Sequence, residues 1–324
     1  VGPLVGGVLT EGIGWEAIFF VNIPLGLGVI ALTLRTVEES RNPAEGRIDV
    51  PGVATFSAAL FLLVFSLIRG NEEGWGSAQI VVMLVAAGVL LLAFLAVERS
   101  SDHPMLELAL FRNPSFVGAS LTAFVLSASI FAMFLYLTLY IQNVLHYSAL
   151  EAGLRFLPTT LLSFFVAPFA GKLAERLGIR WFIGVGLVLV GGGLFSMSGL
   201  SVHDDWTALL PGFVLTGIGV GMVNPALATA AVGVVEPFRA GMASGINSTF
   251  RQVGIATGVA AWGAIFQAAV DAPGGAFVRD RAAFLHGFDR ILVCAAILAV
   301  AGAILCFVLI RPKDFVAHGE SVAA

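Results

Sequence analysis

The feature that most constrains this chain is a succession of apolar runs, each long enough to cross a lipid bilayer. A helix needs about 20 predominantly apolar residues to span the hydrocarbon core. Inside lipid, every backbone amide and carbonyl must be hydrogen-bonded within the protein, so such runs form helices. After a shorter run at 1–10, the full runs lie at 15–34, 51–68, 79–97, 116–140, 150–170, 181–200, 207–231, 245–270 and 290–310. The sequence therefore predicts an all-α polytopic membrane protein with nine full transmembrane helices and one partial helix.

Composition excludes several other classes of protein. Of the 324 residues, 58% are hydrophobic and 12% are charged, whereas a soluble domain carries about 25% charged residues. The mean hydropathy of +0.95 is incompatible with a surface that faces water on all sides. A net charge of −4 gives no electrostatic basis for binding nucleic acid. His and Cys show no spacing typical of metal ligands, so we expect neither a metal nor a cofactor.

The distribution of Lys and Arg between alternate loops predicts the orientation in the membrane. Cytoplasmic loops carry an excess of basic residues. Four basic residues fall in one set of loops, at Arg69, Arg279, Arg281 and Arg290. Eleven fall in the other set and the tail: Arg35, Arg41, Arg47, Arg99, Arg112, Lys172, Arg176, Arg180, Arg239, Arg311 and Lys313. The second set, and with it the C-terminus, is predicted to be cytoplasmic.

The opening run carries a glycine pattern. Gly2 and Gly6 lie four residues apart, a spacing that lets a membrane helix approach a neighbour closely. Between them, Pro3 removes a backbone donor and can kink the helix, and Gly7 follows directly. Taken alone, the pattern is explained equally well by a packing seam without further function.

Together with the segment at 14–26, this pattern resembles a known signature. Residues 2–7 and 14–26 are similar to the antiporter signature on helix five, and the start of helix six, of the major facilitator superfamily. The variant with Trp15, Asn22 and Pro24 resembles the fourteen-helix drug:proton antiporter branch. Residues 104–111 resemble the linker before helix nine of that branch, and 139–153 resemble its junction of helices nine and ten. The resemblance extends over essentially the whole chain.

The resemblance implies a division of the chain into four parts. Residues 1–34 would be the end of an N-terminal bundle, from within helix five to helix six. Residues 35–115 would hold cytoplasmic connectors and two extra helices, and 116–310 a complete C-terminal six-helix bundle. Residues 311–324 would be a cytoplasmic tail. Helices one to four would then precede Val1, so we expect an N-terminally truncated fragment.

A second motif lies between two predicted spans, on the side predicted to be cytoplasmic. Its glycines permit a tight turn, and its charges are suited to pairing between helix ends. A basic cytoplasmic loop without further function is the simpler interpretation. The segment is similar to the gating loop of the superfamily, although Glu175 replaces the usual Asp. The resemblance implies a conformational role for Gly171, Lys172, Glu175, Arg176, Gly178 and Arg180.

Two arginines fall inside predicted spans, where a charge costs about 2.5–3.5 kcal/mol at mid-bilayer. Arg155 lies about one turn from the outer end of 150–170, where it either pairs with Glu151 and serves structure or gating, or couples to substrate or protons. Arg251 lies near the cytoplasmic end of 245–270, where it either anchors the helix at the interface or lines the inner vestibule. Gly254 and Gly258, beside it, are predicted to be a packing pair.

Uncharged polar residues within the spans are weaker candidates. They either bind a ligand or cross-link helices, and the candidate substrate or coupling positions among them are Asn22, Gln142, Asn143 and Asn224. Asn247 and Gln267 have the same two interpretations. Gly217, Gly219 and Gly221 precede Asn224 and predict a tightly packed helix.

None of the nine full runs places an Asp or Glu at mid-membrane. Proton coupling normally needs a titratable group that changes its exposure. We therefore expect the coupling carboxylate in helices one to four, or else no proton coupling.

Four functions remain in competition at this point. The resemblance favours secondary active export of small amphipathic molecules by proton antiport, in the plasma membrane of a bacterium. Its partners would be the lipid bilayer, a small-molecule substrate and protons. A facilitator or symporter of a metabolite shares the fold, and a truncated remnant would not transport. A membrane-embedded enzyme would need a catalytic constellation at one depth, whereas all five His lie in loops, helix ends or the tail.

Overall fold

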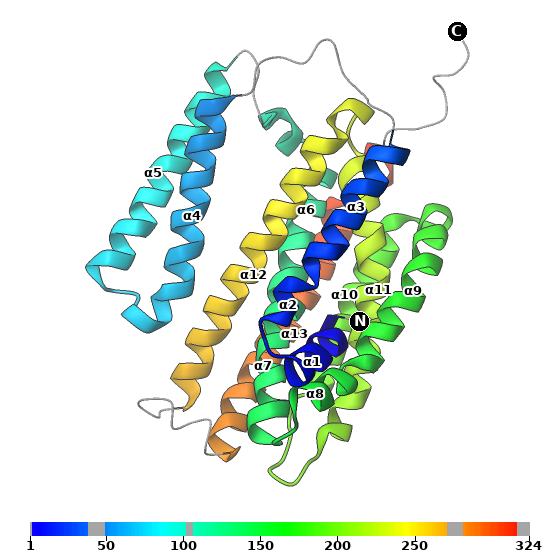
Figure 1. The fold of residues 1–324 in the computed structure, drawn as a ribbon. Helices are drawn as coiled ribbons and strands as arrows, with labels where there is room; N and C mark the ends of the chain where they lie inside the picture. The colour runs from blue at the N-terminus through cyan, green and yellow to red at the C-terminus, as the bar shows by residue number, and fades with distance from the viewer. Residues whose placement is uncertain (1, 38–48, 102–105, 271–280, 316–324) are drawn as a thin grey trace.

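The computed structural model describes residues 2–37, 49–101, 106–270 and 281–315. Within these residues all regular structure is helical, and nine helices are long and apolar enough to cross a membrane (Figure 1). They match the nine predicted spans one for one, which confirms the all-α polytopic class. Several positions named above lie outside the described residues: Arg41, Arg47, Arg279, 104–105 and 316–324.

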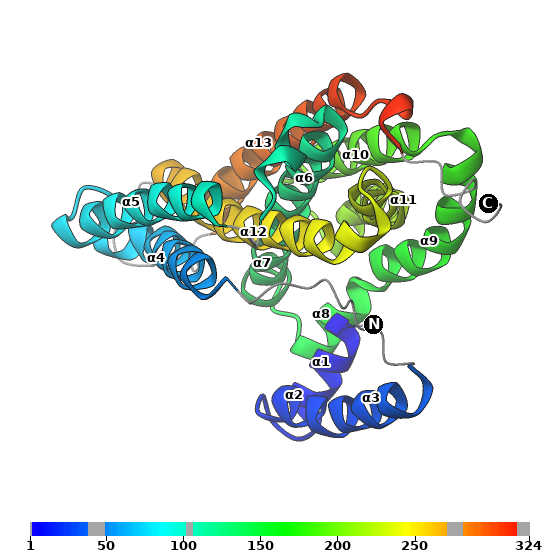
Figure 2. The same ribbon diagram turned by 90° about the horizontal axis from the view of Figure 1, so that it is seen from above.

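The amino-terminal part forms α1 (Gly2–Gly12), α2 (Ala17–Phe20) and α3 (Asn22–Thr36). Seen from above, α2 and α3 stand apart from the main body, to which α1 connects them (Figure 2). No residue of α3 is buried. Its apolar side chains are therefore available to lipid, as expected for a helix that is apolar on all sides.

The next two helices, α4 (Val50–Glu73) and α5 (Ala78–Ser100), form a hairpin beside the main body (Figure 1). Asp49 caps α4 by accepting a hydrogen bond from the Gly52 amide at 2.9 Å. Asn71 ties the hairpin to α12 by donating to the Ala260 carbonyl oxygen at 2.9 Å. The hairpin is thus attached to the bundle at its side and leaves most of its apolar surface exposed.

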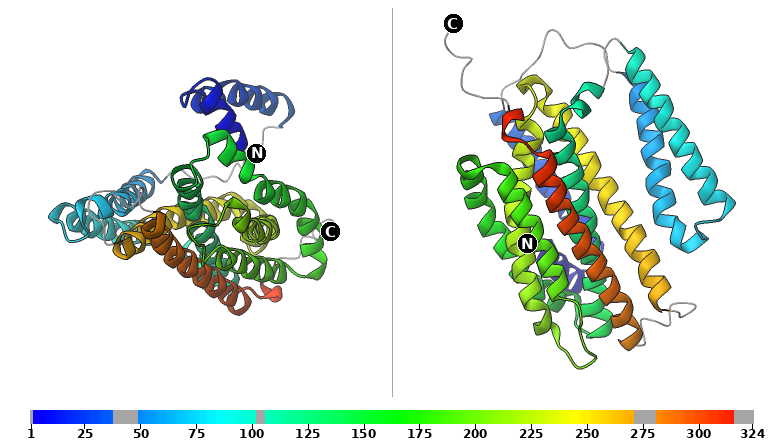
Figure 3. Two further views of the ribbon diagram at one scale, coloured as in Figure 1. Left: turned by 90° about the horizontal axis from the view of Figure 1, so that it is seen from below. Right: turned by 180° about the vertical axis from the view of Figure 1, so that it is seen from behind.

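The main body contains six membrane-crossing units. These are α6 (Pro114–Leu126) continued by α7 (Ala132–Leu139), then α8 (Ala149–Arg155) with α9 (Leu157–Leu177), α10 (Ile179–Ser196), α11 (Leu210–Gly233), α12 (Ala240–Val270) and α13 (Arg281–Leu309). Seen from behind, α13 lies over α6, between α10 and α12 (Figure 3). The ends of α5, α9, α11 and α13 lie at one end of the molecule, which we call the basic side because the sequence predicts its basic loops to be cytoplasmic. Short 3₁₀ turns stand between or after these helices: η1 (Leu108–Arg112), η4 (Trp206–Leu209), η5 (Pro237–Arg239) and η7 (Pro312–Asp314).

Glycines set the closest contacts between these helices. A Cβ added at Gly219 would lie 2.5 Å from the Gly186 carbonyl oxygen of α10, and one added at Gly217 would lie 2.7 Å from the Thr159 carbonyl oxygen of α9. The predicted packing pair on α12 behaves alike. Cβ atoms at Gly254 and Gly258 would lie 2.5 Å from carbonyl oxygens of the helix that begins with α6. Larger side chains at these positions would force the backbones apart.

Two π-helical turns interrupt the first unit of the bundle, η2 (Ser127–Phe131) and η3 (Tyr140–Val144). Such turns release backbone groups from the regular ladder and occur often at functional sites. At η2 the Ala128 carbonyl oxygen accepts a hydrogen bond from the Trp262 indole at 2.7 Å. The same oxygen faces Gly258. Helix α12 therefore packs against the π-helical turn and also supplies the hydrogen-bond donor that its free carbonyl oxygen needs.

Several predicted spans differ at their ends from the observed helices. The run at 290–310 is observed as α13, which begins nine residues earlier, at Arg281. The run at 150–170 is divided at Phe156 into α8 and α9. Pro158 stands in the first turn of α9, where its missing N–H and its ring interrupt the preceding helix. The helix predicted at 245–270 begins earlier, at Ala240, because Pro237 and the following 3₁₀ turn start it.

We predict that Gly258→Ala destabilises the protein in detergent by about 1–3 kcal/mol, because the added Cβ overpacks against η2. Gly245→Ala is the matched control on the same helix, since no atom lies within 4 Å of its added Cβ. That variant should be neutral or slightly stabilising because alanine favours helix by about 1 kcal/mol over glycine. Thermal melting followed by tryptophan fluorescence compares the two, and equal melting temperatures would contradict the packing role.

Candidate functional site

A cavity of about 870 Å³ lies between α1 and the main body, and we call it the central cavity. Its walls come from α1, η2, α7, η3, α8, α9 and α11. Aromatic rings line it at Phe131, Phe134, Phe156 and Phe164. Its polar lining consists of hydroxyls and amides, and no Asp, Glu, Lys or Arg is among the described residues that line it. The cavity is therefore electrically neutral and amphipathic.

The hydroxyl groups in the central cavity face a ligand chiefly as acceptors. Thr10 and Thr138 each donate to a backbone carbonyl oxygen one turn earlier in their own helices, both at 2.7 Å. A hydroxyl whose single O–H already donates a hydrogen bond can still accept one through its lone pairs. Gln142, which is half-buried on η3, adds an amide with both donors and an acceptor. An apolar pocket with a few placed polar groups is typical of small-molecule sites.

α1 and α8 are in contact with each other, and both contribute to the wall of this cavity. Gly7 makes the close approach predicted for Gly2 and Gly6: a Cβ at Gly7 would lie 2.7 Å from the Ala149 carbonyl oxygen, whereas one at Gly2 or Gly6 meets no atom within 4 Å. Gly2 and Gly6 instead border the cavity. The side chain of Pro3 lies outside the described ones, so its predicted kink stays a prediction.

Glu11 completes the same contact. Its carboxylate accepts a hydrogen bond from the Leu150 amide, in the first turn of α8, at 3.0 Å. Hydrogen bonds from the Ser148 side chain and then the Leu150 backbone hold the pKa of Glu11 below its ordinary value. A carboxylate at this position also satisfies helix N-terminal amides that have no partner within the helix. The ionised carboxylate thus stabilises the junction between the two parts of the chain.

Arg155, at the end of α8, takes part in a cluster. Its guanidinium carbon lies 3.3 Å from the Tyr147 ring centroid and 5.3 Å from that of Trp206. The Tyr147 hydroxyl donates to Asp205 at 2.9 Å. The cluster therefore joins the start of α8 to η4 by cation–π and hydrogen-bonding contacts.

The predicted pairing of Arg155 with the Glu151 carboxylate is not observed among the described side chains. Glu151 instead accepts from the Ser148 amide at 2.9 Å, as part of a capping box. Arg155 donates to the Glu151 backbone carbonyl oxygen at 2.9 Å. Moreover, the candidate span in this region is Leu157–Ala174, so Arg155 lies just outside it. These positions favour the structural or gating interpretation of Arg155.

Arg251 and Asn224 are brought together by the fold. Nη1 of Arg251 on α12 donates to Oδ1 of Asn224 on α11 at 2.9 Å, and Nε donates to Oδ1 of Asn247 at 3.3 Å. Because α12 begins at Ala240, Arg251 lies about 16 Å along the helix at 1.5 Å per residue. Arg251 is therefore further from the start of its helix than the predicted span indicates, and its interface or vestibule role stays a prediction.

The predicted gating loop is reduced to a single residue. Gly178 alone separates α9 from α10, and its φ of +99° is a conformation that glycine adopts without strain. Lys172 and Arg176 are exposed, and Arg180 lies against the Trp181 ring. Gly171 lies near Pro225 of α11. The side chain of Glu175 lies outside the described ones, so its predicted pairing stays a prediction.

Other predicted site residues lie away from the central cavity. Asn22 is exposed on α3 and donates to the Ile18 carbonyl oxygen of its own segment at 3.0 Å. Asn143 and Gln267 are exposed and do not line the cavity. Of the predicted uncharged candidates, Gln142 and Asn224 are the two that the fold places in its wall.

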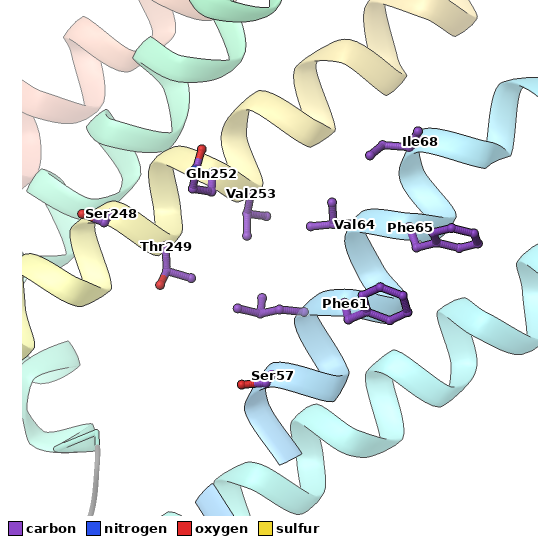
Figure 4. Close-up of a pocket in the computed structure, with 10 residues that line it drawn as sticks. Ser57, Phe61, Val64, Phe65, Ile68, Ser248, Thr249, Gln252 and Val253 are labelled. Carbon is purple, nitrogen blue, oxygen red and sulfur yellow. The ribbon is translucent and has the colours of Figure 1, made fainter. Parts of the chain in front are cut away.

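A second hollow, of about 610 Å³, lies between α4 and α12 (Figure 4). Val64 and Ile68 face it from α4, while Thr249 and Gln252 face it from α12. No described charged residue lines it. Because it brings few polar groups together, the central cavity is the stronger candidate site.

Several contributors escaped the sequence-based predictions. Glu11, Tyr147 and the adjacent residues Asp205 and Trp206 come from three separate parts of the chain and are brought to α8 by the fold. An available signal was the Ser-x-x-Glu pattern at 148–151, which marks the start of a helix. It indicates where α8 begins but does not identify the carboxylate that contacts it from α1.

Comparison with known proteins places these features in a family. The family model described as Major Facilitator Superfamily matches residues 1–259. The chain is 38% identical over 267 residues to multidrug resistance protein Stp of Mycobacterium tuberculosis, covering 82% of this chain and 50% of that protein. It is 35% identical to the cephamycin export protein CmcT of Amycolatopsis lactamdurans (80% and 54% covered). It is 31% identical to the tetracenomycin C resistance and export protein of Streptomyces glaucescens (83% and 50% covered). The chain spans about half the length of the curated relatives it matches.

The fold is also similar to a solved structure, a bacterial homolog of the human lysosomal transporter Spinster in an inward-facing, unoccupied conformation. The TM-score is 0.54 at 18% sequence identity, and the match covers 83% of this chain and 70% of that chain. At this level of identity, the likeness concerns the fold.

We predict that Glu11→Ala lowers the melting temperature at pH 7 because it removes the carboxylate that caps α8. Since the pKa of Glu11 is lowered in the folded state, its contribution is present above its ordinary value of 4.5 and is lost as the pH falls below that value. The melting difference between wild type and variant should therefore shrink on acidification. Glu16→Ala removes the same charge from the neighbouring exposed position. An equal and pH-independent effect of both variants would contradict the capping role.

Proposed function

Because the chain belongs to the major facilitator superfamily, we propose that the whole protein exports small amphipathic molecules by proton antiport and alternating access. The observation that carries this proposal is the neutral central cavity, walled by α1 on one side and the six-helix bundle on the other. A site between two bundles is what alternating access requires, because either side of the site can then be opened by rocking one bundle against the other.

The class of this protein follows from its family and its fold. The chain is an integral membrane protein with the fold of a transporter, and its relatives are transporters rather than enzymes. This excludes the membrane-embedded enzyme. The relatives whose names describe antibiotic export or multidrug resistance support export over the import of a metabolite.

Two contacts are proposed to close and open on opposite sides of the cavity. On one side, Glu11 and Gly7 hold α1 against α8, and Arg155 holds α8 to η4. On the basic side, the α9–α10 turn with Lys172, Glu175, Arg176 and Arg180 would pair differently in the two states. Such alternative pairing is a common way to switch between two packed arrangements.

We place the proton-coupling group outside the described residues. Glu98 lies close to the end of α5 and accepts from the Leu106 amide at 3.0 Å. Asp289 on α13 likewise accepts from the Gly199 amide, in the loop after α10. Both carboxylates are therefore engaged in holding connections. The plasma membrane of a bacterium, with the basic side in the cytoplasm, is the proposed location.

We predict that vesicles containing the whole protein, including any residues that precede Val1, move a fluorescent amphipathic drug when a pH gradient is imposed. The rate should fall to that of protein-free vesicles when an ionophore collapses the gradient, because the proton supplies the driving force. Drug fluorescence in the lumen is the measurement. Equal flux with and without the gradient would remove proton antiport and leave facilitated diffusion.

A further inference from the structure

The polar bridge of Arg251, Asn224 and Asn247 has more hydrogen-bonding capacity than its internal contacts use. A guanidinium carries five N–H donors, and the described contacts between side chains engage Nε and Nη1. Asn247 as a whole is only 6% exposed, and its Nδ2 group is buried with no described hydrogen-bond partner. Buried donors of this kind are normally paired in native proteins, so this group points to a ligand.

The bridge connects the walls of two hollows. Asn224 lines the central cavity. Arg251 and Asn247 line a separate hollow of about 590 Å³ between α11 and α12, together with Thr229, Ser244 and Ser248. The hydrogen bond from Arg251 to Asn224 therefore joins a side chain in the wall of one hollow to a side chain in the wall of the other, and only Asn224 stands between Arg251 and the central cavity along this contact.

The charge of Arg251 is uncompensated in the described part of the chain. No described carboxylate lies within the 4.0 Å ion-pair distance of its guanidinium, whose described partners are two neutral amides. A hydrogen bond whose only role is to hold α11 against α12 needs no charged donor, since a neutral amide side chain can donate it as well. A cation deep in a membrane helix, with free donors facing a hollow, is by contrast suited to an oxyanion, which a guanidinium binds through paired N–H groups.

We propose that Arg251, with Asn224 and Asn247, binds the carboxylate or a similar oxyanion of an amphipathic substrate whose apolar body occupies the central cavity. This inference rests on the proposed export function and specifies its substrate class. Arg251 contributes the charge, and the Nδ2 group of Asn247 contributes a further donor. Asn224 orients the guanidinium by accepting from Nη1.

The test compares two probes with the same aromatic body and opposite charge, 1-naphthoate and 1-naphthylmethylammonium. Binding of each is measured by scintillation proximity with the whole protein in nanodiscs. The wild type should bind the anion more tightly than the cation. Arg251→Gln should weaken binding of the anion by about tenfold or more, since hydrogen bonds to charged groups are individually strong, and should leave binding of the cation unchanged or tighter. Asn247→Leu should weaken binding of the anion by a smaller factor.

Matched controls separate this site from general effects of charge and polarity. Arg112→Gln removes one positive charge from an exposed connector, and Asn143→Leu makes the same change as Asn247→Leu at an exposed position. Neither should alter binding of either probe. An equal loss of both probes in Arg251→Gln would indicate a structural role and overturn the proposal.

The wild type alone also decides the matter should the variants fail to fold. Equal binding of the two probes, or preference for the cation, would overturn the proposal. Drug export by the same purified protein, reconstituted into vesicles, is measured in parallel. Intact export without anion preference then refutes the oxyanion site and leaves the export function standing. Absence of drug export by the wild type would refute the proposed export function itself.

Discussion

Close contact between helix backbones, made at glycine, is the interaction on which this bundle depends. In lipid, two apolar helices gain little from hiding their surfaces from each other, because hydrocarbon is as good a solvent as a neighbouring helix. Packing and interhelical hydrogen bonds must hold them instead. Gly217 and Gly219 seat α11 against α9 and α10, while Gly254 and Gly258 seat α12 against α6 and η2. The cavity-lining residues of η2, α9 and α11 are placed by these contacts.

The same close packing gives the polar groups their places. Where α12 meets η2, the π-helical turn releases the Ala128 carbonyl oxygen, and Trp262 satisfies it. The bulge also ends at Phe131 and is followed by Phe134, and both rings line the central cavity. Most charged side chains of the described residues lie near helix ends or in connectors, whereas Arg251 is the twelfth residue of α12. Its position between two amides that line two different hollows makes it the most informative charged residue of the described spans.

The helical spans were predictable because each is a local property of the chain. A run such as 79–97 is recognisable by its length and hydropathy, and the bounds of α5 agree with it to within a few residues. Helix ends were less predictable. The division at Phe156 depends on Pro158, and the early start of α12 depends on Pro237 and its 3₁₀ turn. In consequence, Arg155 lies outside its candidate span and Arg251 deeper within its helix than the apolar runs indicate.

The amino-acid sequence alone established the membrane class, the number and order of spans, and the family to which its motifs belong. These follow from hydropathy, backbone hydrogen bonding in lipid and short patterns of neighbouring residues. Tertiary structure decided which polar side chains meet. Asn22 and Asn143 have the same chemistry as Asn224, yet only Asn224 reaches both the central cavity and Arg251. Glu11 became a capping group because α1 lies against α8. The physical reason is that a helix apolar on every side carries no periodic signal of which face is turned inward. That choice is made by backbone contacts between segments far apart in the chain.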